Sequence, residues 1–460
     1  MTVINRLKDF FNPYKSVSIA PLVVFRIVFG AMMTFGSLRF LSKGWVNELY
    51  IQPEFYFGYL GFEWVKPLPG NWMYIPFIFF SISSFCIMLG AFYRWSTILL
   101  FISFTYIELL DKTNYLNHYY FISLISFLLI FVPANGFFSL DVKWKRVREI
   151  QQIPLWNIDI FKIQLACVYI FAGIAKLEYD WLINAQPLKI WLQAHRDMNV
   201  FGSLLAKKWV AYLFSWFGCI YDLFIVFFLL SNRFRPFAYV LVIIFHFVTW
   251  YLLPIGIFPW VMIFSTLVFF SISFHENIIQ FLSRLLKHKI NFNSNLRRNF
   301  PSKKWVIVLL GIYFSIQFLI PFRYILNPGN LFWHEEGFRF SWRVMLMHKE
   351  GTATFYVKDR KSGGEIEVPN CSYLSPNQVD QMSTQPDMIL QYAAFLQKKF
   401  SDTLLIYGDQ KVQLQNPSVH ADVFVSLNGR PSQLFLSKKH DLTQIPYNFA
   451  HRNWLEQFKE

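Results

Sequence analysis

Nine long apolar runs fill most of the first 326 residues, and they limit the fold more than any other feature of the sequence. Each run approaches the roughly 20 residues that an α-helix needs to cross a bilayer. Only 15% of the residues are charged, compared with about 25% in soluble domains. We therefore predict an integral membrane protein whose residues 1–326 form an all-α bundle of about nine transmembrane helices. The runs cover approximately residues 17–41, 72–92, 95–111, 118–135, 159–176, 209–231, 235–253, 257–275 and 304–326.

The positive charge of the chain is concentrated in this apolar part. Residues 1–326 contain 29 Lys and Arg against 14 Asp and Glu, whereas residues 327–460 contain 14 of each kind. Nine spans with a cytoplasmic N-terminus place every basic cluster in the cytoplasm and residues 327–460 outside, as the positive-inside rule requires. The charge therefore acts as a topology signal, and we expect no nucleic-acid partner. The clustered residues are Lys143, Lys145, Arg146, Arg148, Arg233, Arg235, Arg284, Lys287, Lys289, Arg297, Arg298, Lys303 and Lys304.

The same topology places three connecting segments on the non-cytoplasmic side, namely residues 42–71, 111–118 and 177–208. Lys176 then lies at the outer end of the fifth span. Asn117 and His118 lie at the outer end of the fourth span. The topology therefore predicts that these polar side chains share one membrane level.

Residues 327–460 have the pattern of a small extracytoplasmic α+β domain. Alternating residues at 352–359 and 365–369 flank a Gly-containing turn, which predicts a β-hairpin. A second hairpin is predicted over 423–436, where Asn428-Gly429 forms the turn and the following proline marks an edge strand.

Two helix starts are predicted in the same domain. Ser375-Pro376 is an N-cap residue followed by proline at the first helical position. Residues 384–387 read Thr-Gln-Pro-Asp, which predicts a capping box before a helix over 388–400.

The four cysteines give no ligand spacing. Cys86, Cys167 and Cys219 lie in apolar runs and are typical of small core residues, and Cys371 stands alone in the tail. No CxxC motif or His/Cys pair with zinc-ligand spacing is present. We therefore expect neither a metal site nor a disulfide framework.

Lys176 is the most informative single residue, because it ends the apolar run at 159–176. An ammonium group next to hydrocarbon is costly unless it is paired, reaches the interface or loses its charge. Two structural interpretations are open: Lys176 extends to the membrane surface, or it pairs with Glu178 or Asp180. In the functional interpretation, removal from water leaves a neutral amine that serves as a general base.

Other polar and aromatic residues of the bundle also have two interpretations each. Asn117 and His118 either begin a helix at the interface or hold a polar ligand by hydrogen bonds. His246 lies in the middle of a span and is either a structural core residue or part of a ligand site. Trp260 either packs within the bundle or forms a wall for a ring-shaped ligand.

The segment at 333–347, which follows the last span, is rich in arginine and tryptophan. It is either an interfacial aromatic and basic belt or a site that holds a carboxylate. Its candidate residues are Arg339, Trp342, Arg343 and Met345.

Four ordered segments span both parts of the chain. They read LDKTNYLNH at 110–118, YIFAGIAKLEYDW at 169–181, GFRFSW at 337–342 and VSLN at 425–428. Together they resemble the vitamin K-dependent γ-glutamyl carboxylases. The wider superfamily shares the helical part, whereas the tail indicates the carboxylase branch.

The resemblance implies a lyase that oxidises vitamin K hydroquinone (phylloquinol or menaquinol) with O2 to the epoxide. The strong base formed on the way removes a γ-proton from a peptide glutamate, and CO2 adds to give γ-carboxyglutamate. By the match, Lys176 corresponds to the lysine proposed to deprotonate the hydroquinone, and Asn117 and His118 to residues that hold its oxygens. The resemblance implies no metal. The tail would lie in the periplasm of a bacterium or in the lumen of the endoplasmic reticulum.

Further expectations concern the walls of the site. We expect His246 and Trp260 to contact the quinone. A glutamate-containing peptide or protein would approach from the tail side. The residues expected to bind it are Arg339, Trp342, Arg343, Met345 and Lys439.

The sequence departs from the animal enzymes at two places in the tail. Phe395 stands where we would look for the cysteine of a disulfide between the tail and the membrane part. Lys438 and Lys439 stand where the animal pattern has arginine.

Two other functions remain open on the same scaffold. One is a quinol epoxidase or oxygenase that does not carboxylate a peptide. The other is a non-catalytic transporter or lipid-binding protein. A transporter would predict inverted repeats and helices broken in pairs by Gly or Pro, and the sequence does not show them.

Cysteine-accessibility labelling tests the predicted topology. Single cysteines introduced near residues 285–300 should be labelled only from the cytoplasmic side, and cysteines in the tail only from the other side, because the basic loops remain inside. Labelling of residues 285–300 from outside would refute the nine-span arrangement.

Overall fold

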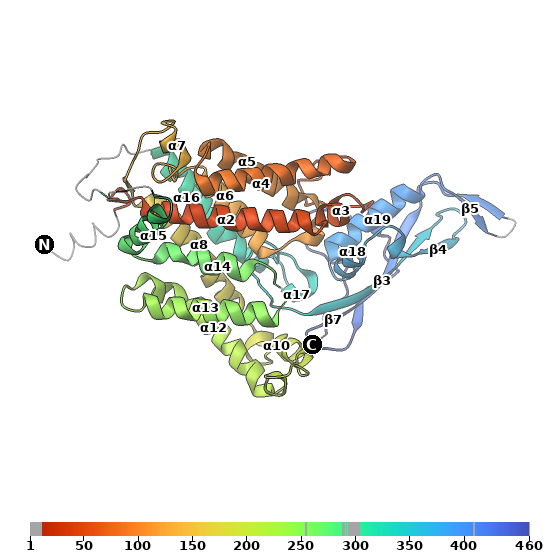
Figure 1. Cartoon of the computed structure of the whole chain (residues 1–460). Helices are drawn as coiled ribbons and strands as arrows, with labels where there is room; N and C mark the ends of the chain where they lie inside the picture. Colours follow the sequence, from red (N-terminus) through yellow and green to blue (C-terminus); the bar gives the residue numbers. More distant parts are fainter. Residues whose placement is uncertain are drawn as a thin grey trace.

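The helical part and the sheet-containing tail occupy opposite ends of the protein (Figure 1). This computed structural model describes residues 12–253, 255–287, 290, 292, 304–407 and 410–459. The short helix α7 (Leu140–Lys143) and α15 (Ile272–Leu285) lie at the end of the bundle that is farthest from the tail. Four residues of the basic loop before the last predicted span lie outside the described residues: Lys289, Arg297, Arg298 and Lys303.

Apolar helices build the bundle, as the hydrophobic runs predict. The longer ones are α2 (Ala20–Ser42), α4 (Tyr74–Leu89), α5 (Tyr93–Leu110), α6 (Asn117–Leu129), α8 (Trp156–Ala175), α12 (Lys208–Leu230), α13 (Arg235–Leu252), α14 (Phe258–Ser265) and α16 (Lys304–Leu319). Shorter helices connect them: α3 (Trp45–Tyr50), α9 (Tyr179–Leu182), α10 (Leu188–Ala194), α11 (Gly202–Leu205) and α17 (Leu331–His334). Strand β1 (Ser16–Ser18) precedes α2, and β2 (Gln152–Pro154) precedes α8; the two strands pair as a two-stranded antiparallel ladder.

The count of nine spans is not confirmed. Within the described residues, six helices are long and apolar enough to cross a membrane, or seven if a pair bent by 113° forms one span. The bent pair, Phe258–Phe269 and Ile272–Leu285, corresponds to the predicted run at 257–275. That run breaks because the Ser271 side chain caps the N-terminus of α15 and starts a separate helix. In addition, α6 has 13 residues, fewer than the roughly 20 that a bilayer needs.

A four-stranded antiparallel sheet forms the centre of the tail, in the order β4-β3-β7-β8. Both predicted hairpins are confirmed, and β8 is the predicted edge strand. The elements are β3 (Lys349–Lys358), β4 (Glu365–Val368), α18 (Pro376–Met382), α19 (Pro386–Phe400), β7 (Ser418–Leu427) and β8 (Gln433–Leu436). An additional hairpin of β5 (Leu404–Tyr407) and β6 (Gln410–Gln413) was not predicted.

One of the two predicted helix starts is correct. Ser375 caps α18 and forms a capping box with Gln378. The capping box predicted at 384–387 is wrong, because α19 begins at Pro386 after Gln385, whose side chain makes no capping hydrogen bond. The physical reason is that the Asp387 carboxylate binds cations elsewhere in the fold.

A hydrophobic core continues from the tail into the bundle. Trp181 and Leu252 of the helical part belong to the same buried cluster as Phe355 and Met388 of the tail. Phe395, at the position where the resemblance suggested a cysteine, packs its ring 4.7 Å from the ring of Phe55. The tail therefore rests on the bundle through apolar contacts. The domain division at residues 326 and 327 stays a prediction, although a 3₁₀ turn (Ile320–Leu326) ends there.

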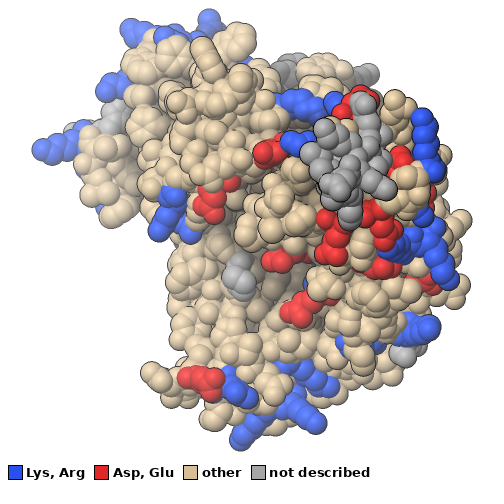
Figure 2. Space-filling view, turned by 90° about the vertical axis from the view of Figure 1, so that its right-hand side faces the viewer, with Lys and Arg blue, Asp and Glu red and all other residues tan. Residues whose placement is uncertain are grey.

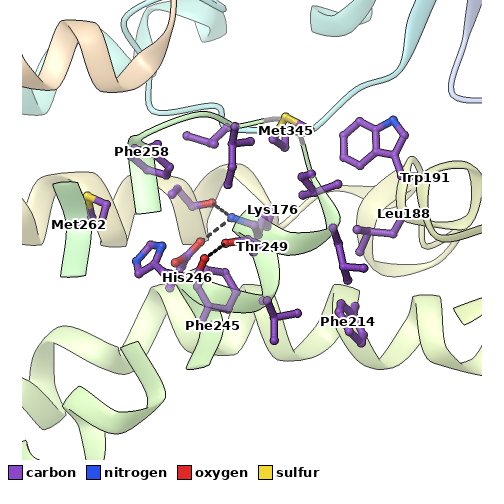
Figure 3. Close-up of a pocket in the computed structure, with 18 of the residues that line it drawn as sticks. Lys176, Leu188, Trp191, Phe214, Phe245, His246, Thr249, Phe258, Met262 and Met345 are labelled. Atoms are coloured by element: carbon purple, nitrogen blue, oxygen red, sulfur yellow. Dashed lines mark hydrogen bonds and ion pairs between the residues drawn. The ribbon is translucent and has the colours of Figure 1, made fainter. Parts of the chain in front are cut away.

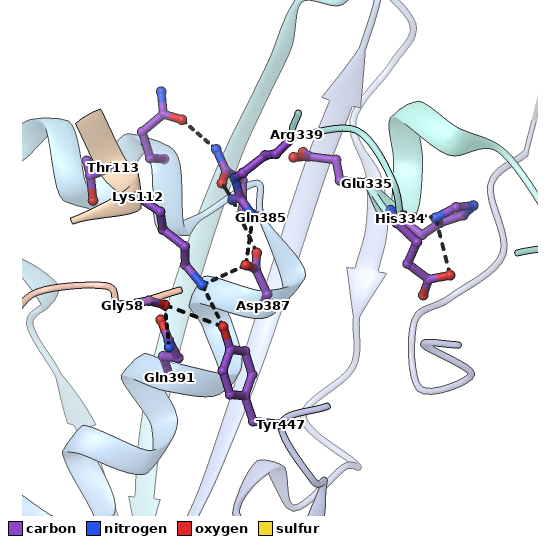
Figure 4. A network of polar contacts seen from close by, with 12 residues as sticks. Gly58, Lys112, Thr113, His334, Glu335, Arg339, Gln385, Asp387, Gln391 and Tyr447 are labelled. Atoms are coloured by element: carbon purple, nitrogen blue, oxygen red, sulfur yellow. Dashed lines mark hydrogen bonds and ion pairs between the residues drawn. The ribbon is translucent and has the colours of Figure 1, made fainter. Parts of the chain in front are cut away.

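Buried charges form a second connection between the two parts (Figure 4). Lys112, between α5 and α6, places its Nζ 2.6 Å from a carboxylate oxygen of Asp387 on α19. Arg339 Nη1 lies 2.8 Å from the same oxygen. Burial alone raises the pKa of Asp387, but the positive charges of Arg339 and Lys112 outweigh it and hold the pKa well below 3.8. An ionised carboxylate thus joins the tail to the loop below it.

Seen from the tail side, the molecule carries charges of both signs (Figure 2). Lys and Arg lie mostly toward the edges of this view, while several Asp and Glu side chains lie nearer a hollow at its centre.

Asp387→Asn should weaken the attachment of the tail. Removing one partner of a buried ion pair leaves an uncompensated charge and costs about 3–5 kcal/mol. We expect this loss in the free energy of unfolding by urea in detergent. The matched control is Asp441→Asn, which breaks the more exposed pair of Arg360 and Asp441 at 2.8 Å and should cost less than about 1 kcal/mol.

The effect of Asp387 should also depend on pH in a defined direction. The pKa of this carboxyl is lower in the folded state, so its stabilisation is complete above the unfolded pKa and disappears as the pH falls through the folded value. The difference in the free energy of unfolding between wild type and Asp387→Asn should therefore be constant around neutral pH and disappear only below about pH 4. Equal losses of unfolding free energy in Asp387→Asn and Asp441→Asn would contradict a stabilising role of the buried Asp387 carboxylate. So would a difference between wild type and Asp387→Asn that disappears near neutral pH.

Candidate functional site

A close approach of two helices positions the central charges. A Cβ atom on Gly173 of α8 would lie 2.7 Å from the backbone nitrogen of Leu223 on α12, so a larger residue would push the helices apart. Lys176 follows Gly173 by three residues and lies on the same side of the helix. Asp222 directly precedes Leu223. The contact at Gly173 therefore brings an amine and a carboxylate together.

Lys176 forms a buried ion pair with Asp222 (Figure 3). Its Nζ lies 2.5 Å from Asp222 Oδ2, and both side chains are 7% exposed. The ammonium group also lies 5.5 Å from the centroid of the Trp181 ring. Lys176 thus neither extends to the surface nor pairs with Asp180, whose carboxylate binds Arg430 at 2.7 Å. The partner, Asp222, lies on the helix of the predicted span at 209–231 and was not among the partners expected from the sequence.

An apolar cavity surrounds this ion pair (Figure 3). Aromatic and aliphatic side chains from α8, α10, α12, α13 and α14 form most of its wall. His246 lines it too, and its Nε2 lies 3.1 Å from the Tyr169 hydroxyl. Its Nδ1 is buried and has no hydrogen-bond partner within the described residues. The apolar lining includes Leu188, Trp191, Phe214, Phe245, Val248 and Phe258.

A second, more polar cavity adjoins the first. It is lined by five residues predicted for the site, namely Asn117, His118, Arg339, Arg343 and Met345. The two cavities share four lining residues: Ile255, Phe258, Val344 and Met345. The structure therefore brings Asn117 and His118 near Lys176, but on the other side of a shared wall.

The Asn117 amide is engaged by the protein itself. Its Nδ2 donates to the Arg343 carbonyl at 3.1 Å, and its Oδ1 accepts from the Tyr115 hydroxyl at 3.1 Å. The His118 ring is buried, with its centroid 5.6 Å from that of Phe258. In this arrangement Asn117 holds the 339–345 segment against α6, and His118 faces the shared wall.

Three predicted residues lie outside both cavities. Trp260 is 39% exposed and packs against Trp250 on the outside of α14. Trp342 is buried behind the polar cavity, with its ring 5.0 Å from that of Tyr120. Lys439 lies exposed after β8.

Arg339 and Arg343 differ in how far their guanidinium groups are already engaged in hydrogen bonds within the protein. Arg339 donates to both carboxylate oxygens of Asp387 and to the Gln385 side chain. Arg343 is buried, lies 4.4 Å over the Tyr324 ring, and has an Nε without a hydrogen-bond partner in the described part of the chain. Burial lowers the pKa of Arg343, and this effect is only partly offset by Tyr324 and Glu178. Arg343 is therefore the guanidinium better placed to receive an anion.

A further contact brings two of the quoted segments together. Asp180, at the end of the 169–181 segment, accepts hydrogen bonds from Asn428 Nδ2 at 2.9 Å and from Arg430. Asn428 lies in the turn after β7 and also receives a bond from the His348 backbone. The tail is thus fixed directly above the loop that follows Lys176.

Asp222 was not predicted as a site residue, although its position in the sequence could have indicated it. Asp222 is the sole acidic residue of α12, a helix of 23 otherwise largely apolar residues. An ionisable residue inside a membrane span marks a functional site by default, together with its partner. Its spacing from Lys176 gave no hint of contact, because 46 residues separate them.

Two family models match the chain. Residues 14–274, more than half of the chain, match the model described as HTTM domain. Residues 302–460 match the model described as vitamin K-dependent gamma-carboxylase, lumenal domain. No solved structure matches the chain. The protein therefore belongs to the vitamin K-dependent γ-carboxylase family, as a multi-pass membrane protein with a lumenal-type tail.

Proposed function

We propose that this protein carboxylates glutamate residues of a peptide or protein, using vitamin K hydroquinone, O2 and CO2. The observation that carries the proposal is the pair of adjoining cavities. One is apolar and contains the Lys176–Asp222 ion pair, and the other contains Arg343 and the Asn117–His118 pair. A lipid-soluble quinol and an anionic side chain require such different surroundings next to each other.

The apolar cavity fits a hydroquinone. Aromatic and aliphatic walls suit its fused ring and its isoprenoid or phytyl tail. Lys176 and the unpartnered Nδ1 of His246 are polar groups that could meet its hydroxyls. When bound, reduced vitamin K supplies the electrons for O2 and the strong base for the glutamate. Lys176 holds or receives the hydroxyl proton at Nζ.

The polar cavity fits the glutamate. A carboxylate placed there would meet Arg343, whose guanidinium can bind it with two parallel hydrogen bonds. The shared wall of Phe258, Val344 and Met345 would then separate water-accessible peptide from the quinol. Exclusion of water matters here, because a strong base that meets water takes a proton from the water and not from the glutamate.

The membrane topology expected from the sequence is compatible with this division. We propose that α5 and α6 complete the membrane crossings, with a cytoplasmic N-terminus and the tail on the lumenal or periplasmic side. The basic residues near α7 support this arrangement, since Figure 1 places α7 at the end of the bundle opposite the tail. The glutamate substrate would enter from the tail side, where Figure 2 shows a hollow.

Purified protein incubated with reduced vitamin K, a glutamate peptide and labelled bicarbonate tests the function. Both vitamin K epoxide and labelled carboxylated peptide should form, and each should depend on O2. Epoxide without labelled peptide would support the epoxidase alternative and contradict carboxylation. Absence of both products would contradict the proposed function.

Lys176→Ala should lower epoxide formation by about 10²–10⁴-fold, the usual contribution of a general base. Lys176→Arg should fail as well, because arginine keeps its charge and cannot exchange a proton in a protein. The measurement is the initial rate of epoxide formation in detergent, with expression and thermal stability recorded for each variant. Near-normal turnover in the arginine variant would show that Lys176 serves only as a structural cation.

Phe258→Ala should lower the ratio of carboxylated peptide to epoxide, because a gap in the shared wall admits water to the base. Trp260→Ala is the matched control on the same helix, since Trp260 lines neither cavity. Its product ratio and its KM for the quinol should equal those of the wild type. A raised KM for the quinol in Trp260→Ala would indicate that Trp260 contacts the quinone. An unchanged ratio of carboxylated peptide to epoxide in Phe258→Ala would show that the shared wall does not keep water from the base.

A further inference from the structure

The ion pair with Asp222 limits how Lys176 can accept a proton. A buried amine 2.5 Å from a carboxylate is held as an ammonium group, with the carboxylate as its counter-charge. An ammonium group has no lone pair and cannot accept a proton. For Lys176 to take a proton from a hydroxyl, it must therefore give one away at the same time.

We propose that Asp222 receives this proton, so that Lys176 and Asp222 work as a two-residue relay. As a quinol O–H bond breaks and a new N–H bond forms at Lys176 Nζ, another N–H bond of Nζ breaks and an O–H bond forms at Asp222 Oδ2. One proton moves at each atom, and no electrons are transferred. This inference rests on the proposed function and assigns Asp222 a role that acts through Lys176.

The geometry supports transfer in this direction. The hydrogen bond from Nζ to Oδ2 is already in place. The walls around the pair are apolar, with Leu188, Phe214 and Phe245 lining the cavity. Charge separation in such surroundings is costly, and the relay avoids it. The two residues and the hydroxyl carry no net charge before the transfer, and the ammonium group neighbours the oxygen that loses its proton afterwards.

The surrounding groups are compatible with this assignment. The titratable side chains nearest the pair are Tyr169 on α8, Cys219 and Tyr221 on α12, and His246 on α13. Each of these is neutral in its ordinary resting form at neutral pH. Asp222 is therefore the anion beside Lys176 and the natural end point for its proton.

The competing role for Asp222 is purely structural. In that case the carboxylate would stay ionised throughout and only hold Lys176 in place. Both roles predict that Asp222→Asn harms the enzyme, so activity alone does not separate them. The protonation of the carboxyl group separates them, and it can be observed without turnover.

Infrared difference spectroscopy provides this readout. Purified protein in lipid nanodiscs would be mixed with reduced phylloquinone without O2, and binding would be measured by retention of phylloquinone on the protein. The relay predicts that a protonated-carboxyl C=O band appears on quinol binding in wild type and is missing in Asp222→Asn. The matched control is Glu108→Gln on α5, whose carboxylate accepts from Ser123 at 2.7 Å and lines another cavity; it should keep the band.

Activity assays complete the test. Asp222→Asn should reduce the kcat of epoxide formation by about 10²-fold or more, while Asp222→Glu, which retains a carboxylate, should recover part of it and show a shifted carboxyl band. If wild type binds the quinol without gaining the band, or if Asp222→Asn retains it, the relay is wrong even when epoxide and carboxylated peptide form normally. If phylloquinol is not retained at all, the proposed function fails and the relay fails with it.

Discussion

The ion pair between Lys176 and Asp222 is the interaction on which the rest of the site depends. Transfer of two charges out of water costs several kcal/mol for each ion, and only close contact in a fixed geometry offsets this cost. The fold provides that geometry through Gly173, which lets α8 and α12 approach to backbone contact. An apolar cavity can therefore contain a buried pair of opposite charges.

The tail completes this centre from above. Val344 and Met345 belong to the segment that leads from the bundle into the tail, and both line the cavity of the ion pair. Asp180 holds the turn after β7, and Asp387 holds Lys112 and Arg339. These buried polar contacts fix the tail in one position relative to the bundle. Residues of both halves line the two cavities, so the proposed site needs the bundle and the tail together.

The sequence predicted the features that depend on local pattern. Both hairpins and the Ser375 cap are confirmed, because turn chemistry and strand alternation act over a few residues. The capping box at 384–387 failed because tertiary charges recruit Asp387. The number of spans could not be read from hydropathy alone. The run at 257–275 is continuous in hydropathy, yet one helix ends at Phe269 and Ser271 caps the next.

The candidate site was predictable in composition and only partly in geometry. Lys176 stood out as a charge beside hydrocarbon, and His246, predicted as a quinone contact, lines the same cavity. Its partner Asp222 was visible as a lone acid in an apolar helix, but no periodicity links positions 46 residues apart. Trp260, also predicted as a quinone contact, lines neither cavity, and aromatic residues in membrane helices face lipid as readily as they face a ligand.

The most direct test of the account is an experimental structure of the protein in nanodiscs with reduced phylloquinone, prepared without O2. We expect the density of the quinol ring between Phe258 and Lys176, with a hydroxyl oxygen within hydrogen-bond distance of Nζ and the phytyl tail directed toward lipid. Density in another cavity, such as the one lined by Glu108, would contradict it. So would a ring in the apolar cavity whose oxygens all point away from the Lys176–Asp222 pair.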